Sequence, residues 1–177
     1  MMHHKRAIMA GSYDPFQRGH AWLVTQALKI AETVAIVISY NADKKGSTFG
    51  LEERKQLIGM VINCDIPVKD HSRITVEVVQ DEILALYARR TGATLLVRGL
   101  RNDLDFRYEH DILDINRIAA PEIETVFMMP PSELTLASST MVKGLLKFNG
   151  GRLIAERFAH TCVVDAIERK INETASN

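Results

Sequence analysis

The sequence has few cysteines, no excess charge of either sign and no long apolar run. Its two cysteines, Cys64 and Cys162, lie far apart without a CxxC spacing. This argues against a disulfide framework or a zinc site and predicts buried or half-buried thiols.

The 22 Lys and Arg residues match the 22 Asp and Glu residues, so the formal net charge is zero. The chain therefore has no general attraction to nucleic acid or to an anionic membrane. No apolar run approaches the ~20 residues of a membrane span, and residues 1–5 lack the apolar stretch of a signal peptide, so we expect a cytoplasmic location.

Several common catalytic motifs are also missing. The chain has no GxxxxGK[ST] loop, no GxGxxG after the first predicted strand, no GxSxG elbow and no HExxH. These absences argue against P-loop phosphotransfer, hydride transfer and triad hydrolysis. No repeat or linker-like tract divides the chain, and its composition is that of an ordinary globular domain, so we predict one domain over residues 1–177.

Short apolar runs alternate with longer amphipathic ones. The predicted strands are Arg6 to Ala10, Thr33 to Ser39, Ile74 to Val79, Thr94 to Val97 and Thr125 to Met129. The predicted helices are His20 to Ala31, Leu51 to Ile62, Glu82 to Arg90, Asp105 to Ala119, Ser138 to Phe148 and Cys162 to Ile171. This alternation predicts an α/β fold with a doubly wound, five-stranded parallel sheet. Ligands of such sheets bind beyond the carboxyl ends of the strands.

The first of these strand ends is suited to bind phosphate. Gly11 and Gly19 permit close backbone approach, Ser12 offers a hydroxyl and His20 stands near the start of the next helix. Free amides at a helix start attract anions. The alternative is a plain loop with His20 as a cap or surface residue.

Cations and hydroxyls follow other strands. Lys44 and Lys45 lie after the second strand, and Arg98 and Arg101 after the fourth. Emerging from a buried strand, Arg98 needs an anionic partner, either a ligand phosphate or a structural carboxylate such as Asp105 or Glu109. Residues 138–140 are three hydroxyl residues before a helix, so each is either an N-cap or part of a second anion site. Together these loops predict a polyphosphate cradle, provided that Asp14, Asp43, Asp103 and Glu133 are paired or turned away.

Two stretches carry a family resemblance. Gly11 to Pro15 followed by Gly19-His20 resembles the signature of the HxGH/TxGH nucleotidylyltransferase superfamily. Arg98-Gly99-Leu100-Arg101, with Asp105-Phe106 and Tyr108-Glu109, is similar to a stretch specific to bacterial phosphopantetheine adenylyltransferases. Further matches run in the family's order along nearly the whole chain.

The resemblance implies a Rossmann-like nucleotidyltransferase fold and a reaction of ATP with 4'-phosphopantetheine. The products are dephospho-coenzyme A and pyrophosphate, in the synthesis of coenzyme A. Mg²⁺ would accompany ATP, coenzyme A is a candidate inhibitor, and a homohexamer is expected. No metal ligand from the protein is assigned.

The resemblance also implies roles for individual residues. The catalytic set is His20, Lys44 and Arg98. The ATP-binding set is Ser12, Tyr13, His20, Gly99, Leu100, Arg101, Glu109, Leu134, Thr135, Leu136, Ala137, Ser138, Ser139 and Thr140. The acceptor-binding set is Ser12, Lys44, Leu84, Arg98 and Asn116.

Some positions depart from the family pattern. Gln17 stands where Thr or His is usual, Leu134 replaces an aromatic residue, and Ala137 replaces a bulkier aliphatic one. Because of Gln17 and Leu134, an alternative function is that of a related nucleotidylyltransferase that uses CTP or another phosphorylated acceptor. A non-catalytic nucleotide-binding module is a further alternative, which the cation set disfavours. Residues 63–73 form a longer connection than the family's and have no functional interpretation.

Overall fold

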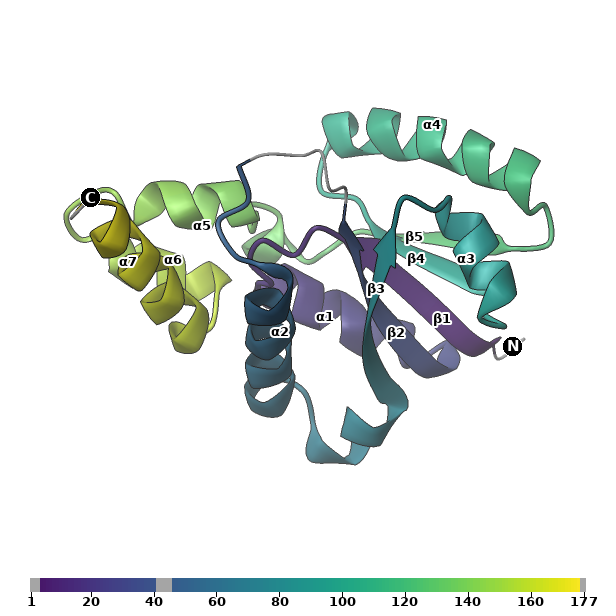
Figure 1. Cartoon of the computed structure of the whole chain (residues 1–177), viewed down its shortest axis with the longest axis horizontal. Coiled ribbons are helices and arrows are strands. Elements are labelled where there is room, and N and C mark those ends of the chain that lie inside the picture. Colours follow the sequence, from purple (N-terminus) through teal and green to yellow (C-terminus); the bar gives the residue numbers. More distant parts are fainter. Residues whose placement is uncertain (1–3, 41–45, 176–177) are drawn as a thin grey trace.

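The computed structural model describes residues 4–40 and 46–175. Five strands form one parallel sheet in the order β3-β2-β1-β4-β5, which confirms the predicted fold class (Figure 1). The strands are β1 (His4–Gly11), β2 (Ala31–Tyr40), β3 (Ile74–Gln80), β4 (Leu95–Gly99) and β5 (Glu124–Met128). Strand order reverses at β1, so the carboxyl ends of β1 and β4 flank the crevice where such sheets bind ligands.

The strands are apolar because both faces of the sheet are covered. Residues 34–38 of β2 form an uninterrupted buried run. Alternate side chains enter different cores: Met9 and Ile36 pack in one cluster, while Ile8, Ala35 and Val37 pack in the other. Each fully buried Ile, Val or Met side chain contributes about 1.5–3 kcal/mol through the hydrophobic effect.

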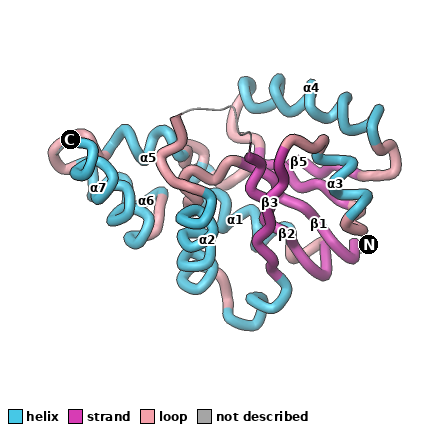
Figure 2. The backbone as a smooth tube through the Cα atoms, viewed as in Figure 1, coloured by secondary structure: helices cyan, strands magenta, loops and turns pink. Residues whose placement is uncertain are grey.

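Helices cover both faces, as Figures 1 and 2 show. The first cluster packs side chains of α1 (Arg18–Ala27), α2 (Leu51–Asp65), α5 (Ser139–Leu145), α6 (Gly151–Phe158) and α7 (Thr161–Ala175). The second packs side chains of α3 (Leu84–Arg90) and residues at the end of α4 (Asp103–Ala119). Two short 3-10 helices, η1 (Val68–Arg73) and η2 (Ser132–Leu134), complete the described elements.

The long connection at residues 63–73 stabilises the turn between α1 and β2. Helix α2 extends to Asp65, and η1 then carries Arg73 back toward the end of α1. Arg73 donates hydrogen bonds of 2.8 Å to the backbone carbonyls of Leu28, Ala31 and Glu32. The Leu28 carbonyl at the C-terminus of α1 has no partner within the helix, and Arg73 satisfies it while also binding the first carbonyls of β2.

Some local predictions need correction. Cys64 is exposed, not buried, whereas Cys162 is half-buried as expected. The predicted final pair of helices is in fact three: α5 ends at Leu145, and an additional helix, α6, begins after Gly150, which adopts a left-handed φ of 77°. In residues 4–40 and 46–175, no helix combines the length and apolar character of a membrane span.

Candidate active site

Two adjoining cavities open at the carboxyl ends of β1 and β4. The smaller, of about 350 Å³, is lined by the β1–α1 loop, the β4–α4 loop and the segment before α5. The larger, of about 730 Å³, extends toward α3 and α4. The cavities share a wall made of Ala10, Gly11, Ser12, Arg98, Ser139 and Thr140. We call them the smaller and the larger cavity below.

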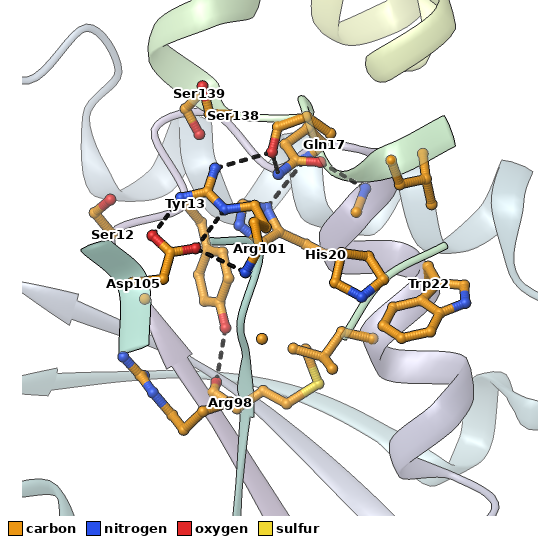
Figure 3. A pocket seen from close by; sticks show the side chains of 18 of the residues that line it. Ser12, Tyr13, Gln17, His20, Trp22, Arg98, Arg101, Asp105, Ser138 and Ser139 are labelled. Carbon is orange, nitrogen blue, oxygen red and sulfur yellow. Dashed lines mark hydrogen bonds and ion pairs between the residues drawn. The ribbon is translucent and has the colours of Figure 1, made fainter. Parts of the chain in front are cut away.

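Aromatic residues of the β1–α1 loop hold the His20 ring in place. Tyr13 takes a left-handed φ of 46°, and its buried hydroxyl donates to the Met9 carbonyl at 2.9 Å. Its ring contacts the His20 ring edge-on at a centroid distance of 5.0 Å, and the Phe16 ring lies 5.1 Å from that of His20. This aromatic packing fixes the imidazole at the wall of the smaller cavity (Figure 3).

His20 is neutral at physiological pH. Burial, reinforced by the positive charge of Arg101, lowers the pKa of His20 to about 3. Its Nδ1 accepts a hydrogen bond from the Gln17 backbone N–H at 3.2 Å, which leaves the proton on Nε2. His20 therefore supplies a hydrogen-bond donor to the cavity and carries no charge at physiological pH.

This low pKa makes a prediction about stability. His20 titrates near pH 6.5 in the unfolded chain but near 3 in the folded one, so between these values the unfolded chain binds more protons. Acidification from pH 6.5 should lower the free energy of unfolding by about 1.4 kcal/mol per pH unit through this residue. Denaturant titrations at pH 6.5 and 5 should show a smaller loss in His20→Asn than in the wild type. The carboxylates titrate alike in both proteins, so equal losses would contradict the shift.

Arg98 and Arg101 are both held by carboxylates. Arg98 donates from Nε and Nη2 to Glu109 at 2.7 and 2.5 Å, and from Nη1 to the Ala10 carbonyl. Arg101 binds Asp105 in the same two-pronged manner at 2.8 and 3.0 Å and donates from Nη1 to the Ala137 carbonyl (Figure 3). Each guanidinium has five N–H donors, so each keeps two for a ligand while its plane is fixed.

The N-terminus of α5 already uses two hydroxyls. Ser138 caps the helix by accepting from the Met141 N–H at 3.1 Å, and Ser139 donates to the Pro15 carbonyl at 2.8 Å. Thr140 is exposed and lines both cavities. The Ser139 contact ties this N-terminus to the β1–α1 loop.

The larger cavity has a polar end and an apolar wall. Leu84 and Asn116 both line it, and the buried Asn116 accepts from the Ala85 N–H at 3.3 Å. Its apolar lining also includes Val79, Ile83, Ile112 and Ile115. This combination suits a ligand with a phosphate at one end and a less polar arm.

Most of the predicted residues converge on these cavities. The smaller cavity is lined by Ser12, Tyr13, His20, Gly99, Arg101, Glu109, Leu134, Ala137, Ser138, Ser139 and Thr140. Leu100, Thr135 and Leu136 border neither cavity, and Lys44 lies outside the described residues. Glu109 has both oxygens on Arg98, which matches the structural partner foreseen for that arginine. The individual binding roles stay predictions.

The acidic residues of these loops have partners or face outward. Asp14 accepts from the N–H groups of Thr48 and Phe49, both at 2.9 Å, and pairs with Lys143 at 3.4 Å. Asp103 and Glu133 are exposed, and Asp43 lies outside the described residues. Among these described acidic residues, none places an unpaired carboxylate against the predicted polyphosphate cradle.

Sequence reasoning assigned no role to several lining residues, among them one aromatic and two cationic side chains. Trp22, the one tryptophan of the chain, lines the smaller cavity, and Arg54 and Lys143 line the larger. Arg54 is 3% exposed and donates to the Ser12 carbonyl at 3.1 Å. Lys143 follows the hydroxyl run by one helical turn, which is the signal that would have found it.

Comparisons with known proteins agree with this geometry. A family model described as cytidylyltransferase-like matches residues 8–145. A phosphopantetheine adenylyltransferase from Neisseria meningitidis serogroup C is 38% identical over 163 residues, 92% of each chain. One from Chromobacterium violaceum is 37% identical over 142 residues, which cover 80% of this chain and 82% of that protein.

Solved structures support the fold. Plasmodium falciparum nicotinic acid mononucleotide adenylyltransferase, complexed with NaAD, has a TM-score of 0.64 at 15% identity, covering 94% of this chain and 96% of that one. The family model and the curated relatives show that the chain belongs to the cytidylyltransferase-like family and, within it, to the phosphopantetheine adenylyltransferases.

Proposed function

We propose that this protein transfers an adenylyl group from ATP to 4'-phosphopantetheine, with release of dephospho-coenzyme A and pyrophosphate. The observation that carries the proposal is the pair of cavities with one shared wall. Ser12 and Arg98 lie on that wall, where two phosphorylated substrates would meet. Family membership at 37–38% identity supports the same reaction.

We assign the nucleotide to the smaller cavity and the acceptor to the larger. The smaller cavity has His20, Arg101 and the backbone of Gly99, which suit a triphosphate and its nucleoside. The larger has Leu84, Asn116 and the isoleucines, which suit the pantetheine arm. In this arrangement the acceptor phosphate lies against Arg98 and reaches the α-phosphorus across Ser12.

The chemistry is an in-line displacement. An acceptor phosphate oxygen forms a bond to the α-phosphorus, and the bond from that phosphorus to the bridging oxygen breaks as pyrophosphate leaves. The attacking phosphate is already anionic, so the protein needs no strong general base. Its tasks are positioning and stabilisation of charge on the transferring group. The Nε2–H of His20 and the free N–H groups of Arg98 and Arg101 are the donors available for this.

Further features belong to the proposal. Mg²⁺ accompanies the triphosphate, whose oxygens are ligands that it prefers. Among the described residues, no group of three or more His, Cys, Asp or Glu gathers as a metal site. Free thiols at Cys64 and Cys162 fit a cytoplasmic location. Coenzyme A shares the pantetheine arm with the acceptor, so it is a candidate inhibitor at the larger cavity.

An activity assay tests the reaction. Purified protein with ATP, Mg²⁺ and 4'-phosphopantetheine should yield pyrophosphate and dephospho-coenzyme A in equal amounts. A parallel reaction with CTP tests the base preference that Leu134 leaves open. Absence of product with ATP would refute the proposal, and product with CTP alone would favour the related cytidylyltransferase.

We also propose that the chain assembles into a homo-oligomer through α4. The family resemblance implies that this oligomer is a hexamer. The buried residues of α4 are Glu109 and Asn116, both polar. In contrast, Leu104 and Ile118 are 74% and 86% exposed. Leu104, Tyr108, Ile115 and Ile118 are spaced by four, seven and three residues and so share one helix face. An exposed apolar stripe of this kind marks an association surface.

Light scattering after size exclusion should therefore give a mass several times that of one chain. Leu104→Glu with Ile118→Glu should reduce it, because two charges would enter the apolar contact. Leu153→Glu on α6, where the side chain is 78% exposed, is the matched control and should leave the mass unchanged. A monomeric wild type would contradict the assembly.

A further inference from the structure

The amide side chain of Gln17 lies at the junction of three loops of the smaller cavity. It is 3% exposed. Its Oε1 accepts from the Gly19 N–H at 2.5 Å, which caps α1, and its Nε2 donates to the Ala137 carbonyl at 3.1 Å. Both ends of the amide are therefore used within the protein, in contrast to an amide directed at substrate phosphates (Figure 3).

The Ala137 carbonyl receives a second hydrogen bond. Arg101 Nη1 donates to it at 3.1 Å, and Asp105 fixes that guanidinium. The start of α1, the β4–α4 loop and the segment before α5 thus meet at one backbone oxygen. That segment carries Leu134, Ala137 and Ser138, and α5 follows with Ser139 and Thr140; all of them line the smaller cavity.

Packing joins the same residues. Ala137 is fully buried. A Cβ built on Gly19 would lie 2.8 Å from Gln17 Oε1 and 3.5 Å from the Ala137 Cβ. The Gln17 amide and the Ala137 methyl therefore fill the two sides of one tight space around Gly19. A larger side chain at 137 would compete with the long side chain at 17.

We infer that Gln17 and Ala137 form a coupled pair of positioning residues that sets the nucleotide-binding segment before α5 against α1. The amide of Gln17 supplies the hydrogen bond, and the small side chain of Ala137 leaves room for it beside Gly19. The inference rests on the proposed nucleotide role of the smaller cavity. Neither residue needs to touch the reacting phosphorus.

A double-mutant cycle tests the coupling. Gln17→Thr removes the hydrogen bond to Ala137, and Ala137→Val adds volume beside Gln17. Each should raise the KM for ATP roughly three- to tenfold, as expected for one buried hydrogen bond or a modest packing conflict, with an unchanged acceptor KM. In the double variant, the added valine methyl groups occupy space that the shorter threonine leaves free, so the KM for ATP should rise less than the product of the single effects. Gln26→Thr, on the same helix, is the control and should leave both KM values unchanged.

A second measurement keeps this test separate from the overall reaction. ATP binding is followed by the fluorescence of Trp22, which lines the same cavity and is the single tryptophan of the chain. If the two substitutions affect ATP binding non-additively but no dephospho-coenzyme A forms, the coupling of Gln17 and Ala137 would be supported and the proposed acceptor would be refuted. The inferred coupling would be wrong if the enzyme turns over normally and the effects of the two single substitutions on the KM for ATP simply multiply in the double variant. It would also be wrong if Gln17→Thr leaves the affinity for ATP unchanged. Loss of kcat and thermal stability at a constant KM would show a purely structural role and overturn it as well.

Discussion

Replacing His20 with Ala should lower kcat roughly 10²–10³-fold, the loss typical of removing one donor to a developing charge. ATP affinity should change much less, because Arg101 and the segment before α5 line the same cavity. The ring is held by Tyr13 and Phe16 and by the Gln17 N–H, so its Nε2–H is already oriented before substrate arrives. A donor fixed in advance stabilises the transition state without a cost of reorganisation.

Steady-state kinetics together with Trp22 fluorescence titrations separate the two effects. His20→Gln retains an amide donor and should recover part of the lost kcat. Its thermal stability should stay close to that of His20→Ala, so a difference in rate would not arise from folding. Equal losses of ATP affinity and turnover in His20→Ala would show that the imidazole acts in ground-state binding instead.

Replacing Arg98 with Ala should have the second large effect, on both acceptor binding and stability. Arg98 is the partner of Glu109, whose side chain is 10% exposed, so its removal leaves a carboxylate buried without a counter-charge. Breaking such a pair costs about 3–5 kcal/mol. The KM for 4'-phosphopantetheine should rise at least tenfold, as for loss of a charge-assisted contact, with a smaller change for ATP.

Two further variants separate the causes of the Arg98→Ala effect. Arg98→Ala with Glu109→Gln removes the unpaired charge, so it should recover stability measured by denaturant titration while the acceptor KM stays high. Arg98→Lys keeps the charge but loses the two-pronged geometry, so it should fall between wild type and Ala. An unchanged acceptor KM in Arg98→Ala would assign the arginine to structure alone.

Local sequence patterns predicted the strands and most helices because their signals are local. The apolar run at residues 34–38 is long enough for a strand buried on both faces, and turn residues separate it from the next helix. Helix ends were less predictable, because capping depends on side-chain geometry. Helix α1 begins at Arg18 because the Gln17 side chain caps it, which residue type alone does not indicate.

The sequence by itself determined the chemistry available at the candidate site. It placed His20, Arg98, Arg101 and the hydroxyls of residues 138–140 after strands, and parallel strands bring such residues to one edge. It also limited the net charge to zero, so anion binding depends on a few local cations. These conclusions follow from residue identity and order along the chain.

Only the tertiary structure decided how those groups are paired. Glu109 holds Arg98, Asp105 holds Arg101, and the Gln17 amide, at the wall of the smaller cavity, donates to the Ala137 carbonyl. It also brought Trp22, Arg54 and Lys143 to the cavity walls. Gln17 and Ala137 are 120 residues apart in the sequence. Contacts at such separation arise from the packing of loops on the sheet, which no local pattern records.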